Sequence, residues 1–377
     1  MLSSVRARPA LARVPALARG IQTFEMLDSD IHKTQSGKTI ITQGSGGRSS
    51  RTGYTATVFG ANGFIGTYLA SKLARKGTIT VVPFREEMAK RHLKPQGDLG
   101  VVNFVEFDLR NVKSIEDSVK HSDIVFNCIG RNFETKNFSY HDVHVEGAKR
   151  IAEAVRKYNV SRFIHLSSYN ADPNSSSLFY KTKGLGEQVV RDIVPDATIV
   201  RPGPVFGDMD KFLNKIASSR NLINSSGNAE LMRPVLVNDV ARALEKIGYD
   251  DSTAGKTFEL YGPDVLSRKQ IIDMIRDATF NNIREVQVPK KVDLLLAELS
   301  KVVWWAVRCP EDVERSFIDQ VVDPNAETFA SLNIRPEALK DNVTRLVRHH
   351  RSYLYSHDSV ETDAKRRKER EYVRIIH

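Results

Sequence analysis

The segment that most constrains the fold is a glycine-rich turn between Gly60 and Gly66. It follows a short β-branched run, 55–60, and opens an amphipathic helix expected over 64–76. In such a turn the first glycine permits a tight bend, the second lets a pyrophosphate approach the backbone, and the third lets the helix pack closely on the strand. The free N–H groups at the helix start favour phosphate oxygens. The turn therefore predicts a dinucleotide site made of Gly60, Ala61, Asn62, Gly63, Phe64, Ile65 and Gly66.

Beyond this turn, strand and helix patterns alternate as far as residue 200. Strands that alternate with helices pair in parallel through right-handed crossovers. The chain is therefore expected to form a Rossmann-type α/β fold, a doubly wound parallel sheet, with a smaller, mostly helical C-terminal region. We place the nucleotide domain with its substrate-lobe elements at 54–285 and the helical region at 286–355. The expected strands are 55–60, 79–84, 101–107, 123–129, 162–167 and 198–200, and the expected helices are 64–76, 112–120, 139–158 and 179–193.

The residue at the end of the second expected strand bears on which dinucleotide is bound. An acid there would hold a free ribose 2′-hydroxyl, whereas a base accommodates a 2′-phosphate. Arg85 occupies this position, and its guanidinium suits a phosphate dianion. We therefore expect NADPH rather than NADH. Glu86 and Glu87 follow at once, so a shift in register would reverse this preference, and Arg85 could also simply end the strand at the surface.

The net charge of +10 is concentrated at the two ends of the chain. Residues 1–20 contain four arginines and no acid, and the highly charged tail at 356–377 holds a second excess of base. An arginine- and alanine-rich start is typical of a mitochondrial presequence, with a disordered basic tail as the alternative. Residues 21–53 are polar and rich in glycine and serine, which predicts a flexible lead-in. The body that remains is nearly neutral, so no nucleic acid is expected as a partner.

Four further segments resemble the extended and atypical short-chain dehydrogenase/reductases. They are Phe107–Arg110, Asn127–Gly130, His165–Ser168 and Arg201–Gly207, and each lies at the end of an expected strand. The resemblance implies that these segments contact the adenine, line the cofactor and flank the nicotinamide. It adds to the expected cofactor site the residues Asp108, Leu109, Ile129, Gly130, Ser167 and Pro202.

The catalytic pair of this family, Tyr-x-x-x-Lys, is incomplete in this chain. Family members carry a glutamate four residues after the lysine, so Glu187 identifies Lys183 as the lysine that holds the ribose. Four residues before it stands Phe179, whose phenyl ring has no proton to donate. We therefore expect no catalytic residue, in a domain that binds its nucleotide without turning it over. The alternative is an active NADP-dependent reductase or epimerase in which a local bulge brings Tyr180 into the site.

The combination of features resembles one group within this family, the dehydrogenase-like accessory subunits of respiratory complex I. The resemblance is carried by 60–66, 82–85, 186–191, 201–207 and 233–235. It implies a mitochondrial protein on the matrix side of the inner membrane, near the quinone-binding region, with other complex I subunits as partners. It also implies a tightly held NADPH with a structural role. An RNA-binding dehydrogenase-like protein is a further alternative.

Residues 292–307 show a pattern that points to an outside contact. On a helix one apolar face is formed by Val292, Leu295, Leu296, Leu299, Val302, Val303 and Ala306. Asp293 lies opposite, and Leu294, Trp304 and Trp305 fall on that other side. A partner or the lipid at the membrane surface would explain the tryptophans, and a helix buried in its own lobe is the alternative. No stretch is long and apolar enough for a transmembrane helix. Two cysteines are too few for a disulfide framework or a zinc site, so no metal is expected.

Overall fold

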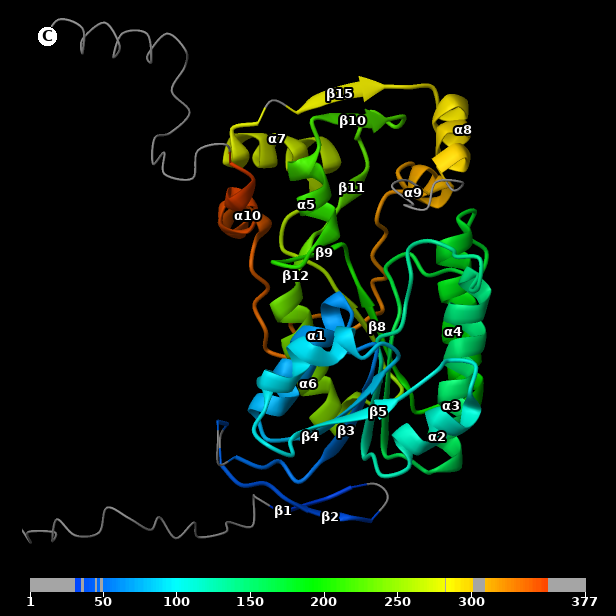
Figure 1. Ribbon diagram of the computed structural model, residues 1–377, viewed down its shortest axis with the longest axis vertical. Helices are drawn as coiled ribbons and strands as arrows, with labels where there is room; N and C mark the ends of the chain where they lie inside the picture. Colours follow the sequence, from blue (N-terminus) through cyan, green and yellow to red (C-terminus); the bar gives the residue numbers. More distant parts are fainter. Residues whose placement is uncertain are drawn as a thin grey trace, which may run out of the picture.

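The computed structural model describes residues 31–34, 37–44, 46–47, 50–281, 283–300 and 309–351. The expected presequence at 1–20 and charged tail at 356–377 lie outside the described residues, as do Trp304 and Trp305. Figure 1 shows a sheet domain in the lower part of the molecule and a smaller lobe above it. Among the described residues, no helix has the length and apolar character that a membrane crossing requires.

Seven parallel strands form the central sheet (Figure 1). Their order, β5-β4-β3-β6-β7-β8-β13, starts near the middle at β3 and winds outward in both directions. Every neighbouring pair is parallel, which confirms the doubly wound Rossmann-type α/β fold. The strands are β3 (Thr55–Phe59), β4 (Ile79–Phe84), β5 (Val102–Glu106), β6 (Ile124–Asn127), β7 (Arg162–Leu166), β8 (Thr198–Pro202) and β13 (Thr257–Leu260).

Helices cover both faces of this sheet, and each face buries its own apolar core (Figure 1). Leu69, Leu73 and Leu244 belong to the core on one side, and Ile151 and Val155 to the core on the other. Burial of such side chains on two faces explains why the strands read as almost continuous apolar runs. The first face carries α1 (Phe64–Arg75) and α6 (Val237–Tyr249), and the second carries α2 (Val112–Val119), α3 (Gly147–Lys157) and α4 (Leu178–Ile193). A π-helical turn, Asp142–Glu146, leads into α3.

The smaller lobe follows β8 and has a core of its own. In it α5 (Lys211–Ser218), α7 (Arg268–Thr279) and α10 (Leu339–Val347) pack together beneath the parallel pair β10 (Asn221–Asn224) and β15 (Arg284–Gln287). Two shorter strand pairs each contribute residues to this core. They are β9 (Val205–Phe206) with β12 (Val235–Leu236), and β11 (Leu231–Met232) with β14 (Leu266–Ser267).

The C-terminal region contains helices joined by irregular chain. Helix α8 (Lys290–Ser300) and the short α9 (Pro310–Arg315) lie above the start of α4 (Figure 1). The chain from 316 to 338 then runs back past the edge of the sheet, where Glu327 pairs with Phe258 of β13, before α10 returns to the smaller lobe.

The apolar face expected on α8 exists, but it points away from the protein. Asp293 and Ala297 are fully buried, whereas Leu295 and Leu299 are 61% and 60% exposed. The predicted grouping of the aliphatic residues is thus correct for the described part of 292–307. The alternative, a helix that buries this face in its own lobe, is wrong there.

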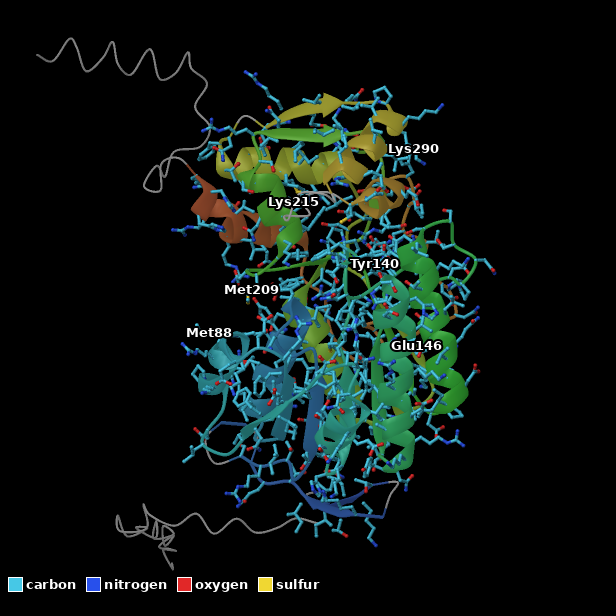
Figure 2. The ribbon with its side chains drawn as sticks, turned by 45° about the vertical axis from the view of Figure 1, so that its right-hand side comes forward. Met88, Tyr140, Glu146, Met209, Lys215 and Lys290 are labelled. Carbon is cyan, nitrogen blue, oxygen red and sulfur yellow. The ribbon has the colours of Figure 1, made fainter. Side chains whose placement is uncertain are left out.

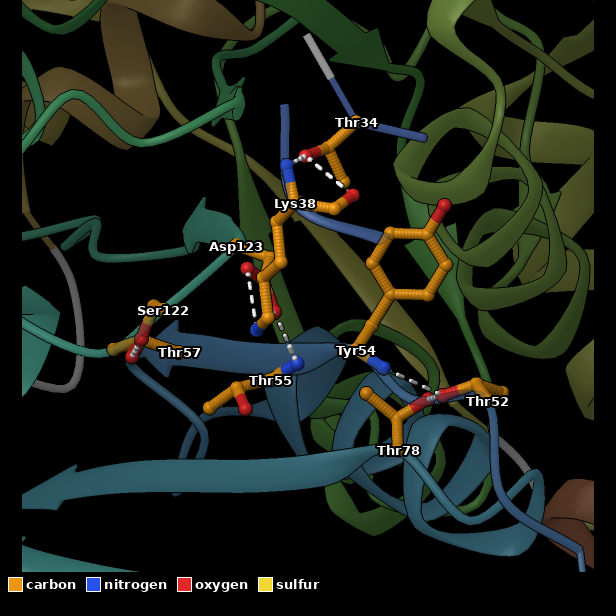
Figure 3. Close-up of polar contacts among 9 residues, drawn as sticks. All are labelled: Thr34, Lys38, Thr52, Tyr54, Thr55, Thr57, Thr78, Ser122 and Asp123. Carbon is orange, nitrogen blue, oxygen red and sulfur yellow. Dashed lines mark hydrogen bonds and ion pairs between the residues drawn. The ribbon is translucent and has the colours of Figure 1, made fainter. Parts of the chain in front are cut away.

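A hairpin from the N-terminal segment closes the far end of the sheet. Strands β1 (Ile31–Lys33) and β2 (Thr39–Ile41) pair antiparallel, and Ile40 is 2% exposed. The Lys38 ammonium lies 2.9 Å from a carboxylate oxygen of Asp123, which also accepts a 2.9 Å hydrogen bond from the Thr55 backbone N–H (Figure 3). The described part of 21–53 therefore differs from the expected flexible lead-in, because burial of Ile40 and this ion pair anchor it.

Candidate nucleotide-binding groove

The turn from Gly60 to Gly66 has the geometry that the sequence predicts. Gly60 has a φ of +79°, a left-handed conformation that favours glycine. A β-carbon on Gly66 would lie 2.3 Å from the Gly60 carbonyl oxygen, so only glycine allows α1 to pack this closely. A β-carbon on Gly63 would meet nothing closer than that same oxygen, at 3.1 Å. The space in front of Gly63 is thus open at the N-terminus of α1, where phosphate oxygens bind.

The other predicted residues lie along the same edge of the sheet. In a parallel sheet the carboxyl ends of all strands meet at one edge, where open α/β folds bind their ligands. Arg85 follows β4, Asp108 and Leu109 follow β5, Ile129 and Gly130 follow β6, Ser167 follows β7, and Pro202 ends β8. The Ser167 hydroxyl oxygen and the Asn62 side-chain oxygen are buried and lack a hydrogen-bond partner among the described residues. Such atoms fit polar groups of a dinucleotide in this groove.

Among the predicted cofactor-binding residues, Asp108 has the surroundings that point least clearly to a ligand. One of its carboxylate oxygens accepts a 2.8 Å hydrogen bond from the backbone N–H of Arg110, and its side chain is exposed. Its neighbour Leu109 packs against Gly147, where a β-carbon would lie 2.9 Å from the Leu109 side chain. This segment closes the β5 end of the groove.

Two arginines stand together at the position expected for a 2′-phosphate. The Arg85 side chain is 54% exposed, and its nearest acid, Glu86, lies 3.8 Å away. Burial and the neighbouring Arg85 guanidinium lower the pKa of Arg131, which follows directly after Gly130. Arg131 was not predicted, although a basic residue directly after the predicted segment Asn127–Gly130 was a usable signal. Two guanidinium groups that repel each other favour a nearby dianion.

Lys183 of α4 lies at the bottom of the groove. Its ammonium donates a 3.3 Å hydrogen bond to the Leu166 carbonyl, and a β-carbon on Gly130 would lie 3.2 Å from it. Burial lowers the pKa of Lys183 to about 8, although Glu187 one helical turn away opposes this shift. Glu187 itself is engaged by Arg201, whose guanidinium lies 2.6 Å from it. Lys183 is thus a buried cation that faces the strand ends, as a lysine that holds a ribose must be.

The ring of Phe179, four residues before Lys183, is enclosed by other side chains. It is 5% exposed and makes edge contacts with His144 and Tyr140, with ring centroids 5.4 and 6.0 Å apart. The Arg315 guanidinium lies 4.5 Å from the Phe179 ring centroid. Figure 2 places Tyr140 at the level where the sheet domain meets the smaller lobe.

Tyr180, the neighbour of Phe179, is not turned toward the groove. Helix α4 is regular from Leu178 onward, so it contains no bulge that would turn Tyr180 toward the groove. The Tyr180 side chain is 1% exposed and packs against Tyr169, with ring centroids 5.5 Å apart. Burial raises the pKa of the Tyr180 hydroxyl far above its usual value, which makes it a poor acid or base at neutral pH.

Two buried histidines behind the groove predict a loss of stability in mild acid. His144 bonds to the Thr182 hydroxyl at 3.0 Å, and His165 to the Asn127 amide at 3.1 Å. Burial lowers the pKa of His144 to about 2 and that of His165 to about 3. Since an unfolded histidine has a pKa near 6.5, the contribution of the neutral form is fully present above that pH and is lost as the pH falls below it.

We expect each histidine to remove about 2 kcal/mol of unfolding free energy by about pH 5. Urea unfolding of the nucleotide-free protein at several pH values would measure this. His144→Asn should reduce the slope of stability against pH by roughly one proton. An unfolding free energy that does not change over this range would contradict the prediction.

Comparison with known proteins assigns the chain to a family. Residues 56–247 match the NAD dependent epimerase/dehydratase family. Over 349 residues the chain is 51% identical to the NADH-ubiquinone oxidoreductase 40 kDa subunit, mitochondrial, of Neurospora crassa. This alignment covers 92% of this chain and 93% of that protein. The chain belongs to the family of this complex I subunit.

Another protein of the 40 kDa subunit family is the mouse NADH dehydrogenase (ubiquinone) 1 alpha subcomplex subunit 9, mitochondrial. It is 35% identical over 330 residues, covering 85% of this chain and 87% of that protein. Among solved structures, a Thermus thermophilus UDP-glucose 4-epimerase complex with NAD superimposes with a TM-score of 0.61 over 79% of this chain and 99% of that one. Its 17% identity shows the common fold alone. The predicted resemblance to complex I subunits is confirmed, and the epimerase-type fold indicates a groove for a nucleotide cofactor.

Proposed function

We propose that this chain is a non-catalytic accessory subunit of mitochondrial complex I that holds NADPH as a structural cofactor. It would lie on the matrix side of the inner membrane, near the quinone region, and contact other subunits of the complex. Bound NADPH would stabilise the folded subunit by mass action, because it binds the native state and not the unfolded one. When bound, NADPH would supply a hydride donor, but Phe179 offers no acid or base at the position where this family places its tyrosine.

The observation that carries this proposal is an intact nucleotide groove beside an enclosed phenylalanine. The glycine turn, Lys183 and the Ser167 hydroxyl, which has no hydrogen-bond partner within the described part of the chain, are all suited to a dinucleotide. Phe179 stands where the proton donor would be, and the neighbouring Tyr180 is buried. The open space at Gly63 and the buried Lys183 support binding of a nucleotide, and Phe179 supports the absence of turnover.

The arginine pair predicts selective retention of NADPH. We expect the double substitution Arg85→Ala with Arg131→Ala to weaken NADPH retention by about ten- to a hundred-fold, the equivalent of lost charge-assisted hydrogen bonds. NADH binding should change little, because NADH lacks the 2′-phosphate. Equilibrium dialysis with both nucleotides would measure this, with the exposed Arg91→Ala as a matched control. Equal losses for the two nucleotides would refute the 2′-phosphate assignment.

The proposed function as a whole is tested by isolation of the native protein. The protein should be purified from mitochondrial membranes without denaturation, its co-purifying chains identified and its released nucleotide analysed. We expect other complex I subunits and NADPH in about equal amount to this chain. A protein free of respiratory-chain partners, or one that carries no nucleotide, would overturn the proposal.

The exposed face of α8 supports a contact with the membrane surface. Val292, Leu295, Leu296 and Leu299 lie outward, and Lys290 and Lys291 stand at the start of the helix. An apolar face with basic residues beside it suits an anionic bilayer surface, where aliphatic side chains enter the headgroup boundary. Flotation of the protein with anionic vesicles should fall when Leu295 and Leu299 are replaced by Ser. Unchanged flotation would favour another subunit as the partner of this face.

A further inference from the structure

We propose that the chain segment 309–321 occupies the position from which a substrate would approach the nucleotide, with Arg315 held over Phe179 in the substrate's place. This inference rests on the proposed function, because it takes the nucleotide to lie in the groove. It goes further, because it makes the chain itself, and not only the missing tyrosine, the reason that the nucleotide is not used.

The first attachment of this segment is at the start of α4. The Glu311 carboxylate accepts a 2.8 Å hydrogen bond from the Ser177 hydroxyl and a 3.4 Å hydrogen bond from the Phe179 backbone N–H. Ser177 is fully buried, and its own side chain does not cap the helix. The first N–H groups of a helix need partners and favour negative charge. Glu311 thus supplies the N-terminal cap of α4 from a part of the sequence more than a hundred residues away.

The second attachment is the guanidinium of Arg315. It lies 4.5 Å from the Phe179 ring centroid, its side chain is 17% exposed, and it is paired with Asp312 on the same helix. Tyr140, Tyr169 and Tyr180 are near enough to interact with it electrostatically. A cation over an aromatic face is attracted by the ring, and more strongly where water is excluded. A phenyl ring suits this arrangement, since the tyrosine of an active enzyme would need its ring edge open to substrate.

The third attachment lies further along the segment, on the loops beyond β7 and before β12. Asn170 donates a 2.7 Å hydrogen bond to the Asp319 carbonyl and accepts a 2.9 Å hydrogen bond from the Val321 N–H. The Gln320 side-chain oxygen accepts a 2.7 Å hydrogen bond from the Arg233 N–H. Ile318 packs on the cluster of Tyr140, Phe179 and Tyr180. The segment therefore runs from the start of α4, past the loop that follows β7, to the chain before β12.

These three attachments distinguish the segment from a loosely closing lid. Hydrogen bonds fix it at both ends, and an aromatic cluster fixes its middle, so lifting it would leave buried polar groups unpaired. Restoring the hydroxyl with Phe179→Tyr would accordingly not give a substrate access to it. Access should also require loss of the Glu311 and Arg315 contacts.

The two cysteines of the chain provide a direct test. Cys309 is the N-cap residue of α9 and is 8% exposed, and neither cysteine is in a disulfide. In a Cys128→Ser background, a thiol reagent such as a maleimide would report only on Cys309. We expect Glu311→Ala with Arg315→Ala to raise the labelling rate of folded protein by at least about ten-fold, because local opening exposes the thiol.

The matched control is Glu314→Ala, which removes a carboxylate from the same helix without touching α4, and should leave the rate unchanged. Arg315→Met keeps the packing without the charge, and its rate should lie between those of the control and the double variant. This milder substitution covers the case in which the double variant fails to fold. If the double variant folds and its Cys309 is labelled at the control rate, the proposal is overturned. If only Arg315→Met folds, labelling of that variant at the control rate overturns it.

A second measurement separates this proposal from the proposed function. If NADPH co-purifies, the dye phenazine methosulfate, which takes a hydride from the nicotinamide, should oxidise it faster in the double variant than in the control. Equally fast oxidation in both would count against the segment as a barrier. If no NADPH is present, the proposed function fails, but the labelling of Cys309 still decides whether the segment closes the site.

Discussion

Gly66→Ala should lower the unfolding free energy of the nucleotide-free protein by about 3 kcal/mol, the upper range for overpacking a close contact. The added methyl would lie 2.3 Å from the Gly60 carbonyl oxygen and 2.8 Å from the Ala61 α-carbon. Both are backbone atoms, so neither can turn aside. We therefore expect α1 to shift on the sheet, with loss of both stability and nucleotide binding. Urea unfolding and nucleotide analysis of the purified variant would measure the two effects.

Gly63→Ala is the matched control, because it should separate binding from stability. At Gly63 the backbone has a φ of −78° and ψ of 171°, which alanine adopts without strain, and the new methyl meets only one oxygen at 3.1 Å. The fold should change by less than about 1 kcal/mol, since the unfolded chain also loses freedom. NADPH should nevertheless be lost, because the methyl fills the approach of the pyrophosphate. A Gly63→Ala protein that keeps NADPH would show that the turn does not hold the phosphates.

Lys183→Met should make the nucleotide-free protein more stable while abolishing NADPH retention. Burial lowers the pKa of Lys183 to about 8 from an unfolded value of 10.5, so the charged form is disfavoured in the folded state. This penalty is fully present below the folded pKa and disappears as the pH rises toward the unfolded one. At neutral pH its removal should stabilise the fold by about 3 kcal/mol. Methionine keeps most of the volume and apolar contact.

The measurement is urea unfolding of the parent and of Lys183→Met at neutral pH and again near pH 10, where the gain should shrink. Bound nucleotide should be measured on the same samples. A parent protein as stable as the variant at neutral pH would mean that Lys183 carries no burial penalty. Retained NADPH in the variant would remove Lys183 from the binding site.

The sheet domain could be predicted from the sequence because its signals are local. The strand at 79–84 is observed with the same bounds, and the helix expected at 64–76 is observed as Phe64–Arg75. The residues after each strand could be placed together because parallel strands end at one edge. Membership in the complex I subunit family followed from the same motifs.

The parts that the sequence did not predict depend on contacts between distant residues. No local sequence pattern indicates that Glu311 contacts α4, because its partners Phe179 and Ser177 lie 132 and 134 positions away. The same holds for Arg315, whose contact with Phe179 also joins distant positions. In α8 the charged Asp293 is buried and the leucines are exposed, the reverse of the usual pattern for a surface helix. The periodicity of the sequence therefore predicted which residues share the apolar face, but not that this face points outward. The hairpin at 31–41 is short and polar in composition and is fixed by one buried isoleucine and a partner 85 positions away.

The ion pair between Lys38 and Asp123 has a consequence for how the chain folds. Because its partners are 85 positions apart, closing it before the central strands exist would cost much loop entropy for one ion pair. We expect the hairpin to dock after β3 and β6 have paired, and so to be absent from the folding transition state. Lys38→Ala would then leave the refolding rate nearly unchanged and speed unfolding. The hairpin would therefore slow unfolding and lengthen the lifetime of the native state, with little effect on how fast the chain folds.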